Sequence, residues 1–112
     1  VSGVIAWSEG EAHVYYNYNS KTIYRVTKST LSEMGIEILK DETSENENYY
    51  IIAGKNDKFK ITIQPYEKEI SKLSIRVNFM GDKPYAELLY KKIEENIATI
   101  NFRDGNPVRK FQ

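Results

Sequence analysis

The segment LSIRVNFMGDKPYAELLYKKI, residues 73–93, decides the fold because it joins two different apolar periodicities. In its first half apolar and polar residues alternate, as in a strand with one face on the core and one in water. In its second half apolar residues recur at i and i+4, as in an amphipathic helix over Lys83–Ile97. The apolar positions are Leu73, Ile75, Val77 and Phe79 in the strand and Tyr85, Leu89, Ile93 and Ile97 in the helix.

The junction between the two patterns admits two interpretations. A glycine and a lysine before a helix occur in phosphate-binding loops, but those loops need several glycines at a fixed spacing, as in G-x-x-x-x-G-K-[ST]. The junction has only Gly81, which permits a reversal of the backbone. Asp82 stands where a helix N-cap belongs, and Pro84 falls in the first turn, where a missing N–H costs nothing. We therefore interpret the junction as a helix start and not as a ligand site.

Upstream of this segment, the sequence predicts a hairpin followed by a first helix. Alternating residues flank a turn in the hairpin, and a 3.6-residue apolar stripe marks the helix. Asn19 or Ser20 offers its N-cap, and Gly35 offers its C-terminal stop. The predicted bounds are Val4–Trp7 and Ala12–Tyr18 for the hairpin strands, Glu9–Gly10 for their turn, and Lys21–Met34 for the helix.

Between the two helices, the pattern predicts an antiparallel meander. Its acidic stretch, Lys40–Asn48, is typical of a solvated loop, and Pro65 is expected to end a strand because proline cannot donate to a sheet. The predicted strands are Ile36–Ile38, Tyr49–Gly54, Phe59–Ile63 and Leu73–Phe79, with a turn at Tyr66–Glu69. The tail from Ala98, with a turn signal at Asp104–Pro107, is either a short docked segment or a frayed end. The predicted fold class is α+β: an antiparallel sheet of about six strands with two helices on one face.

Composition narrows the function classes. The chain has 112 residues, which fits one domain over 1–112. Lys plus Arg and Asp plus Glu both number 16, so no net charge favours nucleic acid, and none is expected as a partner. The absence of cysteine excludes disulfides and thiol catalysis within the chain. No apolar run approaches the roughly 18 residues that a transmembrane helix needs.

Candidate chemical groups are few. His13 is the only histidine, it is expected on the strand face opposite Ala12 and Val14, and no nucleophile or ligand motif accompanies it. The tyrosine pairs Tyr15-Tyr16 and Tyr49-Tyr50 predict that one ring of each packs inward and the other lies on the sheet surface. The alternative is that these rings form a partner-binding or ligand-lining surface. We therefore expect no catalytic residue, no metal, no cofactor and no enzymatic activity.

The order of these segments resembles a family of small bacterial envelope lipoproteins of unknown function. It is most similar to the Francisella surface lipoproteins studied as virulence determinants. The resemblance covers about residues 3–97, and none of the pieces that carry it is catalytic. They are SIRVNFMGD at 74–82, LSEMGI at 31–36 and LLYKKI at 88–93, together with KFKITIQ at 58–64 and the helical stretch from Asn19.

The resemblance implies a lipid anchor on a cysteine upstream of Val1, with residues 1–3 as a tether, and a location in the cell envelope, on the outer membrane. It also implies an antiparallel sheet that grips a helix, as in the birch-pollen-allergen or helix-grip folds, which often enclose an apolar cavity. The second helix is predicted at about 15 residues, which is short for such a fold, so a smaller or closed cavity is expected.

Two functions follow from these expectations. The first is a non-enzymatic, lipid-anchored envelope protein, virulence-associated by resemblance, that interacts with a host or envelope protein. The alternative is a carrier that holds a small apolar ligand between the sheet and the second helix, with the Tyr85 hydroxyl as a polar contact. The ligand-lining residues predicted for the carrier are Ile61, Ile63, Ile75, Val77, Phe79, Tyr85, Leu89 and Ile93.

Overall fold

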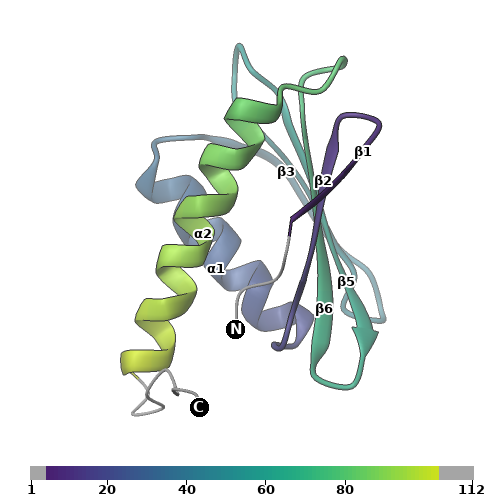
Figure 1. Ribbon diagram of the computed structural model, residues 1–112, viewed down its shortest axis with the longest axis vertical. Helices are drawn as coiled ribbons and strands as arrows, with labels where there is room; N and C mark the ends of the chain where they lie inside the picture. Colours follow the sequence, from purple (N-terminus) through teal and green to yellow (C-terminus); the bar gives the residue numbers. More distant parts are fainter. Residues whose placement is uncertain (1–4, 104–112) are drawn as a thin grey trace.

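A computed structural model describes residues 5–103, with side chains to residue 100, and has the predicted α+β class. Six antiparallel strands form one sheet, and both helices lie on one face of it (Figure 1). The elements are β1 (Ala6–Ser8), β2 (Glu11–Tyr16), α1 (Ser20–Glu33), β3 (Ile38–Thr43), β4 (Tyr49–Ala53), β5 (Phe59–Glu67), β6 (Ile70–Val77) and α2 (Lys83–Arg103). The finer likeness to a helix-grip fold stays a prediction.

The strand order β1-β2-β6-β5-β4-β3 sets the N-terminal hairpin beside β6, the last strand of the chain. The β1–β2 hairpin leads into α1, and the meander from β3 to β6 then returns to pair β6 with β2. In this pairing His13 lies opposite Ser74, although the two are far apart in sequence. Because α2 follows β6 directly, it crosses the centre of the sheet, where it contacts β2, β6 and α1.

The core is a single layer between the sheet and the helices. Alternate residues of β2, β4, β5 and β6 point to the helix-covered face, as the period-2 pattern predicts. The helices complete the layer with apolar stripes at 3.6-residue spacing. The fully buried members include Ala12, Val14, Ile51, Ile61, Ile63, Leu73, Ile75 and Val77 from the sheet and Ile23, Leu31, Ala86, Leu89 and Ile93 from the helices.

The helix ends confirm the capping predictions. The Asn19 side chain accepts a hydrogen bond of 2.9 Å from the backbone N–H of Thr22, so Asn19 and not Ser20 is the N-cap of α1. Gly35 follows α1 with φ of +72°, a conformation that glycine adopts without a steric penalty. The carboxylate of Asp82 accepts a hydrogen bond of 3.2 Å from the N–H of Tyr85 at the start of α2.

Four predictions for the meander are wrong. The strand predicted at Ile36–Ile38 is not formed, since β3 begins only at Ile38, and the turn predicted at Tyr66–Glu69 is shorter, since β5 runs to Glu67. The acidic stretch Lys40–Asn48 is not all loop, because β3 occupies Ile38–Thr43 and only the residues after it form a turn. β3 is an edge strand with both faces largely open to water, so charged residues are tolerated there. Pro65 does not end its strand either. β5 pairs with β4 only as far as Ile63, and beyond that point Pro65 lies on a free edge that needs no donor.

The second helix is longer than predicted. α2 has 21 residues and continues to Arg103, so the expectation of a tail from Ala98 is wrong up to that residue. Ile100 extends the apolar stripe and packs against the core, which gives the extra turns a reason to form. The turn signal at Asp104–Pro107 lies outside the described residues. Neither α1 nor α2, as far as they are described, combines the length and apolarity that crossing a membrane requires.

Candidate functional site

Most residues predicted to line the carrier pocket do lie together in the structure, but their own side chains fill the space between the sheet and the second helix. Six of its eight predicted residues have no exposed surface and pack together as part of the core: Ile61, Ile63, Ile75, Val77, Leu89 and Ile93. Tyr85 is half-buried, and its ring meets Phe59 edge-on at 5.2 Å between centroids. Tyr85 and Phe59 border a hollow of about 340 Å³ that is otherwise lined by the two loops at 35–37 and 54–57.

The eighth predicted residue, Phe79, does not lie on the inner sheet face. β6 ends at Val77, and Asn78 takes a left-handed conformation with φ of +63°. This reverses the chain, so Phe79 and Met80 point into solvent with 89% and 82% of their surface exposed. The period-2 pattern alone placed Phe79 inward. The signal that could have corrected it is Asn78, since asparagine tolerates positive φ and often ends a strand.

The backbone that carries Phe79 and Met80 is held by hydrogen bonds on both sides of the reversal. On one side, Asn78 and Lys58 are joined twice: the Asn78 N–H donates to the Lys58 carbonyl at 2.7 Å, and the Lys58 N–H donates to Asn78 Oδ1 at 2.9 Å. Asn78 Nδ2 also donates to Asp57 Oδ1 at 3.0 Å. Beyond the reversal, the Asp82 N–H donates to the Val77 carbonyl at 2.8 Å. The loop is thus tied to the β4–β5 turn and to its own strand.

A second set of contacts ties the same loop to the β1–β2 turn. The guanidinium of Arg76 donates from Nη1 to the Phe79 carbonyl at 3.2 Å and from Nη2 to the Glu9 carbonyl at 2.6 Å. Gly10 and Gly81 lie back to back with φ of +80° and +85°. A Cβ on Gly81 would come within 2.7 Å of the Gly10 backbone, so only glycine fits this contact. Two exposed apolar side chains therefore stand on an ordered base.

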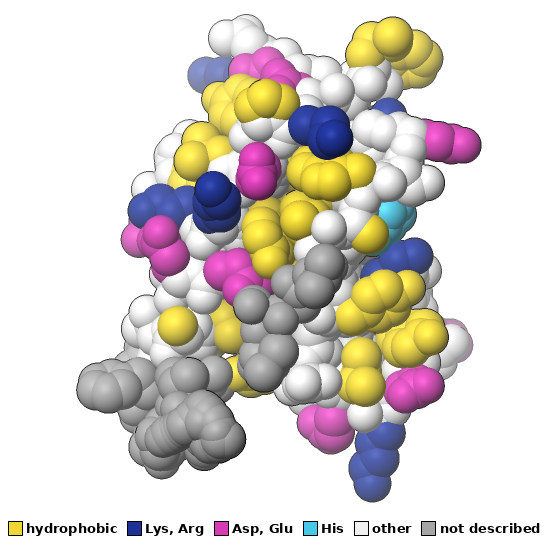
Figure 2. Space-filling view, in the orientation of Figure 1, with side chains coloured by type: hydrophobic (Ala, Val, Ile, Leu, Met, Phe, Trp, Pro, Cys, Tyr) yellow, Lys and Arg dark blue, Asp and Glu magenta, His cyan; other side chains and the backbone are white. Residues whose placement is uncertain are grey.

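Charged residues of both signs lie in and beside this base, among them the carboxylates of Asp57 and Asp82. Lys55, Lys58 and Lys83 are exposed, and the Lys83 ammonium lies 5.0 Å from the centre of the Trp7 ring. Figure 2 shows a hydrophobic projection at the end of the molecule where Figure 1 places the β6–α2 loop. We call Phe79 and Met80 the apolar tip. It is the feature of the described surface in which large apolar side chains are most exposed.

The sheet face that the helices leave open carries the polar groups, including His13. Its Nδ1 lies 3.1 Å from Ser74 Oγ, and its Nε2 lies 3.4 Å from a carboxylate oxygen of Glu11. The sequence offered no motif for these partners, because they meet only through the β2–β6 register. A serine, a histidine and a carboxylate in this order suggest hydrolysis. However, His13 and Ser74 pair with neighbours on both sides, so their backbone N–H groups belong to the ladder and not to an oxyanion hole.

Both tyrosine-pair predictions are confirmed. Tyr16 and Tyr49 are buried, while Tyr15 and Tyr50 lie on the open face. Tyr49 stacks on Tyr24 of α1 with 4.0 Å between centroids. Each inward ring therefore contributes to packing, and the outward rings meet side chains of the open face, Tyr15 beside Tyr66 and Tyr50 with the Lys40 ammonium 5.8 Å from its centre.

The Tyr16 hydroxyl lies at the edge of the core, near the carboxylate of the partly buried Glu94. The Tyr16 hydroxyl and Glu94 Oε2 are both buried and have no hydrogen-bond partner among the described residues. Burial raises the pKa of Tyr16 strongly, and the nearby Glu94 carboxylate raises it further because it disfavours a phenolate. In the folded protein the Tyr16 hydroxyl therefore stays protonated at pH values far above the usual pKa of a tyrosine.

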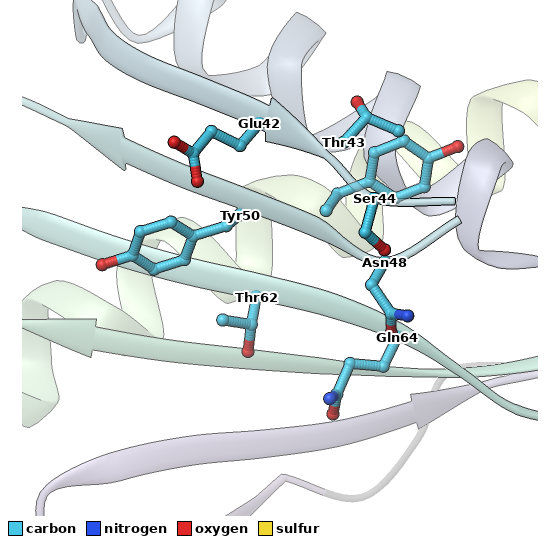
Figure 3. Close-up of a pocket in the computed structure, with 8 residues that line it drawn as sticks. Glu42, Thr43, Ser44, Asn48, Tyr50, Thr62 and Gln64 are labelled. Atoms are coloured by element: carbon cyan, nitrogen blue, oxygen red, sulfur yellow. The ribbon is translucent and has the colours of Figure 1, made fainter. Parts of the chain in front are cut away.

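The open face also contains a shallow hollow of about 420 Å³ near its β3 edge (Figure 3). We call it the outer-face hollow. The Tyr50 ring, a carboxylate and several amide and hydroxyl groups surround it, from β3, β4, β5 and the turn after β3. Its lining residues are Glu42, Thr43, Ser44, Asn48, Tyr49, Tyr50, Thr62 and Gln64. Sequence reasoning raised only the Tyr49-Tyr50 pair, as an alternative partner-binding or ligand-lining surface. It did not find the other residues, because they come together only when three strands pair.

The described chain is therefore a small α+β domain whose candidate sites lie on its surface, with its predicted internal site closed. A family model described as "Protein of unknown function (DUF3568)" matches residues 1–96, and the chain belongs to this family. A search of curated proteins finds no match.

Proposed function

We propose that this protein is a non-enzymatic component of the bacterial cell envelope whose apolar tip, Phe79 and Met80, contacts a lipid surface. The observation that carries the proposal is that both side chains are more than four-fifths exposed on a backbone held by hydrogen bonds. Exposed apolar surface is unfavourable in water, and a flexible loop would be free to fold these side chains back. A base that keeps them outward fits a surface built to insert into an apolar phase.

A lipid surface fits the tip better than a protein partner does. Stable protein interfaces bury about 800 Å² on each side and need a matching shape over that area. The tip offers two side chains at the end of a loop, and the residues beside it are mostly polar or charged, among them Asp57, Lys58 and Asp82. A bilayer needs no shape complementarity, and exposed lysines near the tip would meet lipid phosphates.

The tip alone would bind membranes weakly. Burying one Phe or Met side chain contributes about 1.5–3 kcal/mol. The sum is comparable to one myristoyl chain, which gives only marginal and reversible binding, so a stable attachment takes a second signal. In our proposal the second signal is the lipid anchor that the envelope-lipoprotein resemblance implies, and the tip orients the domain on the membrane surface.

The lipid anchor has its own test. Protein isolated from the native membrane fraction should carry acyl chains on a cysteine within a few residues upstream of Val1, measured by mass spectrometry. An unmodified protein whose upstream sequence lacks cysteine would contradict the anchor. It would leave the tip proposal standing, because the tip is tested without any anchor.

The tip is tested by co-sedimentation of the chain with vesicles of phosphatidylethanolamine and phosphatidylglycerol. The unmodified chain should bind weakly, and the double variant Phe79→Ser/Met80→Ser should partition at least about tenfold less, equivalent to about 1.4 kcal/mol. Leu88→Ser is the matched control, since Leu88 is an exposed apolar residue too, with 49% of its surface open, but lies on α2. It should bind like the unchanged chain.

Equal binding of the double variant and the unchanged chain would sink the lipid proposal. So would a loss of binding in the Leu88 control of the same size, because it would point to general hydrophobicity. If no vesicle binding occurs and the double variant instead loses a defined protein complex, the tip serves a host or envelope protein partner.

The carrier alternative receives less support. A ligand between the sheet and α2 would have to displace side chains with no exposed surface, such as Ile75 and Leu89, from a filled core. The apolar tip needs no such rearrangement. NMR shift perturbation by apolar probes distinguishes the two functions, since carrier activity would shift inner-face residues and tip binding would not.

A further inference from the structure

Most polar side chains around the outer-face hollow make no side-chain hydrogen bond within the part of the chain that the structure describes. Asn48, Thr62 and Gln64 line the hollow, and no side-chain hydrogen bond joins any of them to another described residue. The Tyr50 hydroxyl is likewise free of such a bond. This differs from the other end of the same sheet face, where His13 bonds to Ser74 and Arg76 bonds to the Glu9 carbonyl. The hollow is therefore a concentration of unused donors and acceptors.

The chemistry of the lining is that of an aromatic surface edged by neutral polar groups. The half-buried Tyr50 ring lies beside the hollow, and Thr62 lies directly opposite it on β5 (Figure 3). Two carboxamides, Asn48 and Gln64, can each donate and accept hydrogen bonds. The volume of about 420 Å³ lies within the range of roughly 300–1,000 Å³ that small-molecule sites occupy.

The charges around the hollow exclude several ligand classes. The one carboxylate of its lining, Glu42, pairs at 3.4 Å with Lys40 beside the hollow, so its charge is balanced and no unpaired charge favours an anion or a cation. Nucleic acid needs a basic track along its phosphates, which this lining lacks. A peptide that added to the β3 edge would meet the charged side chains of Lys40, Asp41 and Glu42, which typically protect an edge from such pairing. A neutral ligand rich in hydroxyl groups remains.

We infer that the outer-face hollow binds a neutral saccharide. The apolar face of a sugar ring lies against the Tyr50 ring, and its hydroxyl groups exchange hydrogen bonds with Asn48, Thr62 and Gln64. Because the hollow is shallow and open, we expect weak binding of one sugar unit, which repetition of the contact along a longer saccharide would strengthen. This inference does not depend on the lipid proposal, since the apolar tip and the hollow share no residue.

The test is a ¹H–¹⁵N NMR titration of the whole chain with cellobiose, maltose and N,N′-diacetylchitobiose. At least one should shift the backbone amides of residues 42–50 and 62–64 in a saturable way, while glycerol and inorganic sulfate at equal concentration should not. Tyr50→Ala should weaken this binding at least about tenfold, and Gln64→Ala, at an exposed position, should weaken it severalfold.

Tyr15→Ala is the matched control, because Tyr15 is a half-exposed tyrosine on the same face that contacts Tyr66 outside the hollow. It should bind sugar like the unchanged chain. The inference is overturned if none of the three sugars shifts the hollow, if glycerol shifts it equally, or if the Tyr15 variant loses binding as much as the Tyr50 variant. Gln64→Ala keeps the test valid if Tyr50→Ala fails to fold.

Discussion

Val77 and Phe79 are two residues apart in one alternating pattern, yet their surroundings are opposite. Val77 has no exposed surface and belongs to the core, whereas 89% of Phe79 is exposed at the apolar tip. The difference arises at Asn78, whose positive φ ends β6 and turns the next residues away from the sheet. Apolar character therefore has two uses in this protein: it holds the core together, and it is displayed on a base that the core supports.

The sharpest way to test this contrast is to truncate one residue from each region. Ile75→Ala removes a fully buried side chain from the layer between sheet and helices and should lower the free energy of unfolding by about 2–5 kcal/mol. Phe79→Ala should change it by less than about 0.5 kcal/mol, because an exposed ring loses no packing. Urea denaturation measures both values. A large loss in the Phe79 variant would mean that the tip packs in solution and is not displayed.

A second test concerns the base under the apolar tip. Gly81→Ala should destabilise the fold by about 1–3 kcal/mol, because it combines a positive φ with a Cβ placed 2.7 Å from the Gly10 backbone. Gly35→Ala is the control, since Gly35 also has positive φ but has open space around its missing Cβ. Thermal unfolding of the two variants separates the close contact from the backbone conformation. If both lose the same stability, the Gly10–Gly81 contact contributes nothing of its own.

The third test concerns the buried hydroxyl of Tyr16 and the pH dependence of stability that it predicts. Folding raises the pKa of Tyr16, so the folded chain keeps a proton that the unfolded chain loses above about pH 10. This contribution is complete below that pH and is lost as the pH rises, by up to about 1.4 kcal/mol per pH unit. Tyr16→Phe should match the unchanged chain within about 1 kcal/mol at pH 7, because the hydroxyl has no hydrogen-bond partner.

The difference appears at high pH. Urea denaturation should show that the unchanged chain loses stability more steeply than Tyr16→Phe between about pH 10 and pH 11. Tyr49→Phe is a useful comparison, since burial also raises the pKa of Tyr49, although the shift is smaller. Parallel curves for the unchanged chain and Tyr16→Phe would show that Tyr16 is not the group responsible.

The smallest expected effect is on the open face. His13→Ala removes contacts with Ser74 and Glu11 that are partly exposed, so the free energy of unfolding should change by less than about 0.5 kcal/mol. Chemical denaturation at neutral pH measures it. A loss of sugar or vesicle binding in this variant, with the fold intact, would show that the His13 contacts have a function we have not assigned.

Much of the architecture was determined by the sequence alone. Local patterns were enough to predict an element wherever its buried residues recur with the period of its secondary structure, as in β6 and α2. They were also enough to predict helix ends, where the side chain of Asn19 or Asp82 accepts a hydrogen bond from a backbone N–H three residues later. These interactions join residues a few positions apart, so their spacing along the chain carries the information.

Tertiary structure alone decided the sites. The strand order places β3 at an edge of the sheet, where the acidic residues Asp41 and Glu42 can be part of a strand. It also leaves Pro65 without a neighbouring strand that would need a hydrogen bond from its backbone nitrogen. The packing of the helices on the sheet leaves the predicted carrier residues without exposed surface. Such packing depends on the side chains of every surrounding element, so a local pattern cannot predict it. The apolar tip and the outer-face hollow arise from contacts between distant segments, such as Arg76 with Glu9 and Tyr50 with Thr62, which no local pattern encodes.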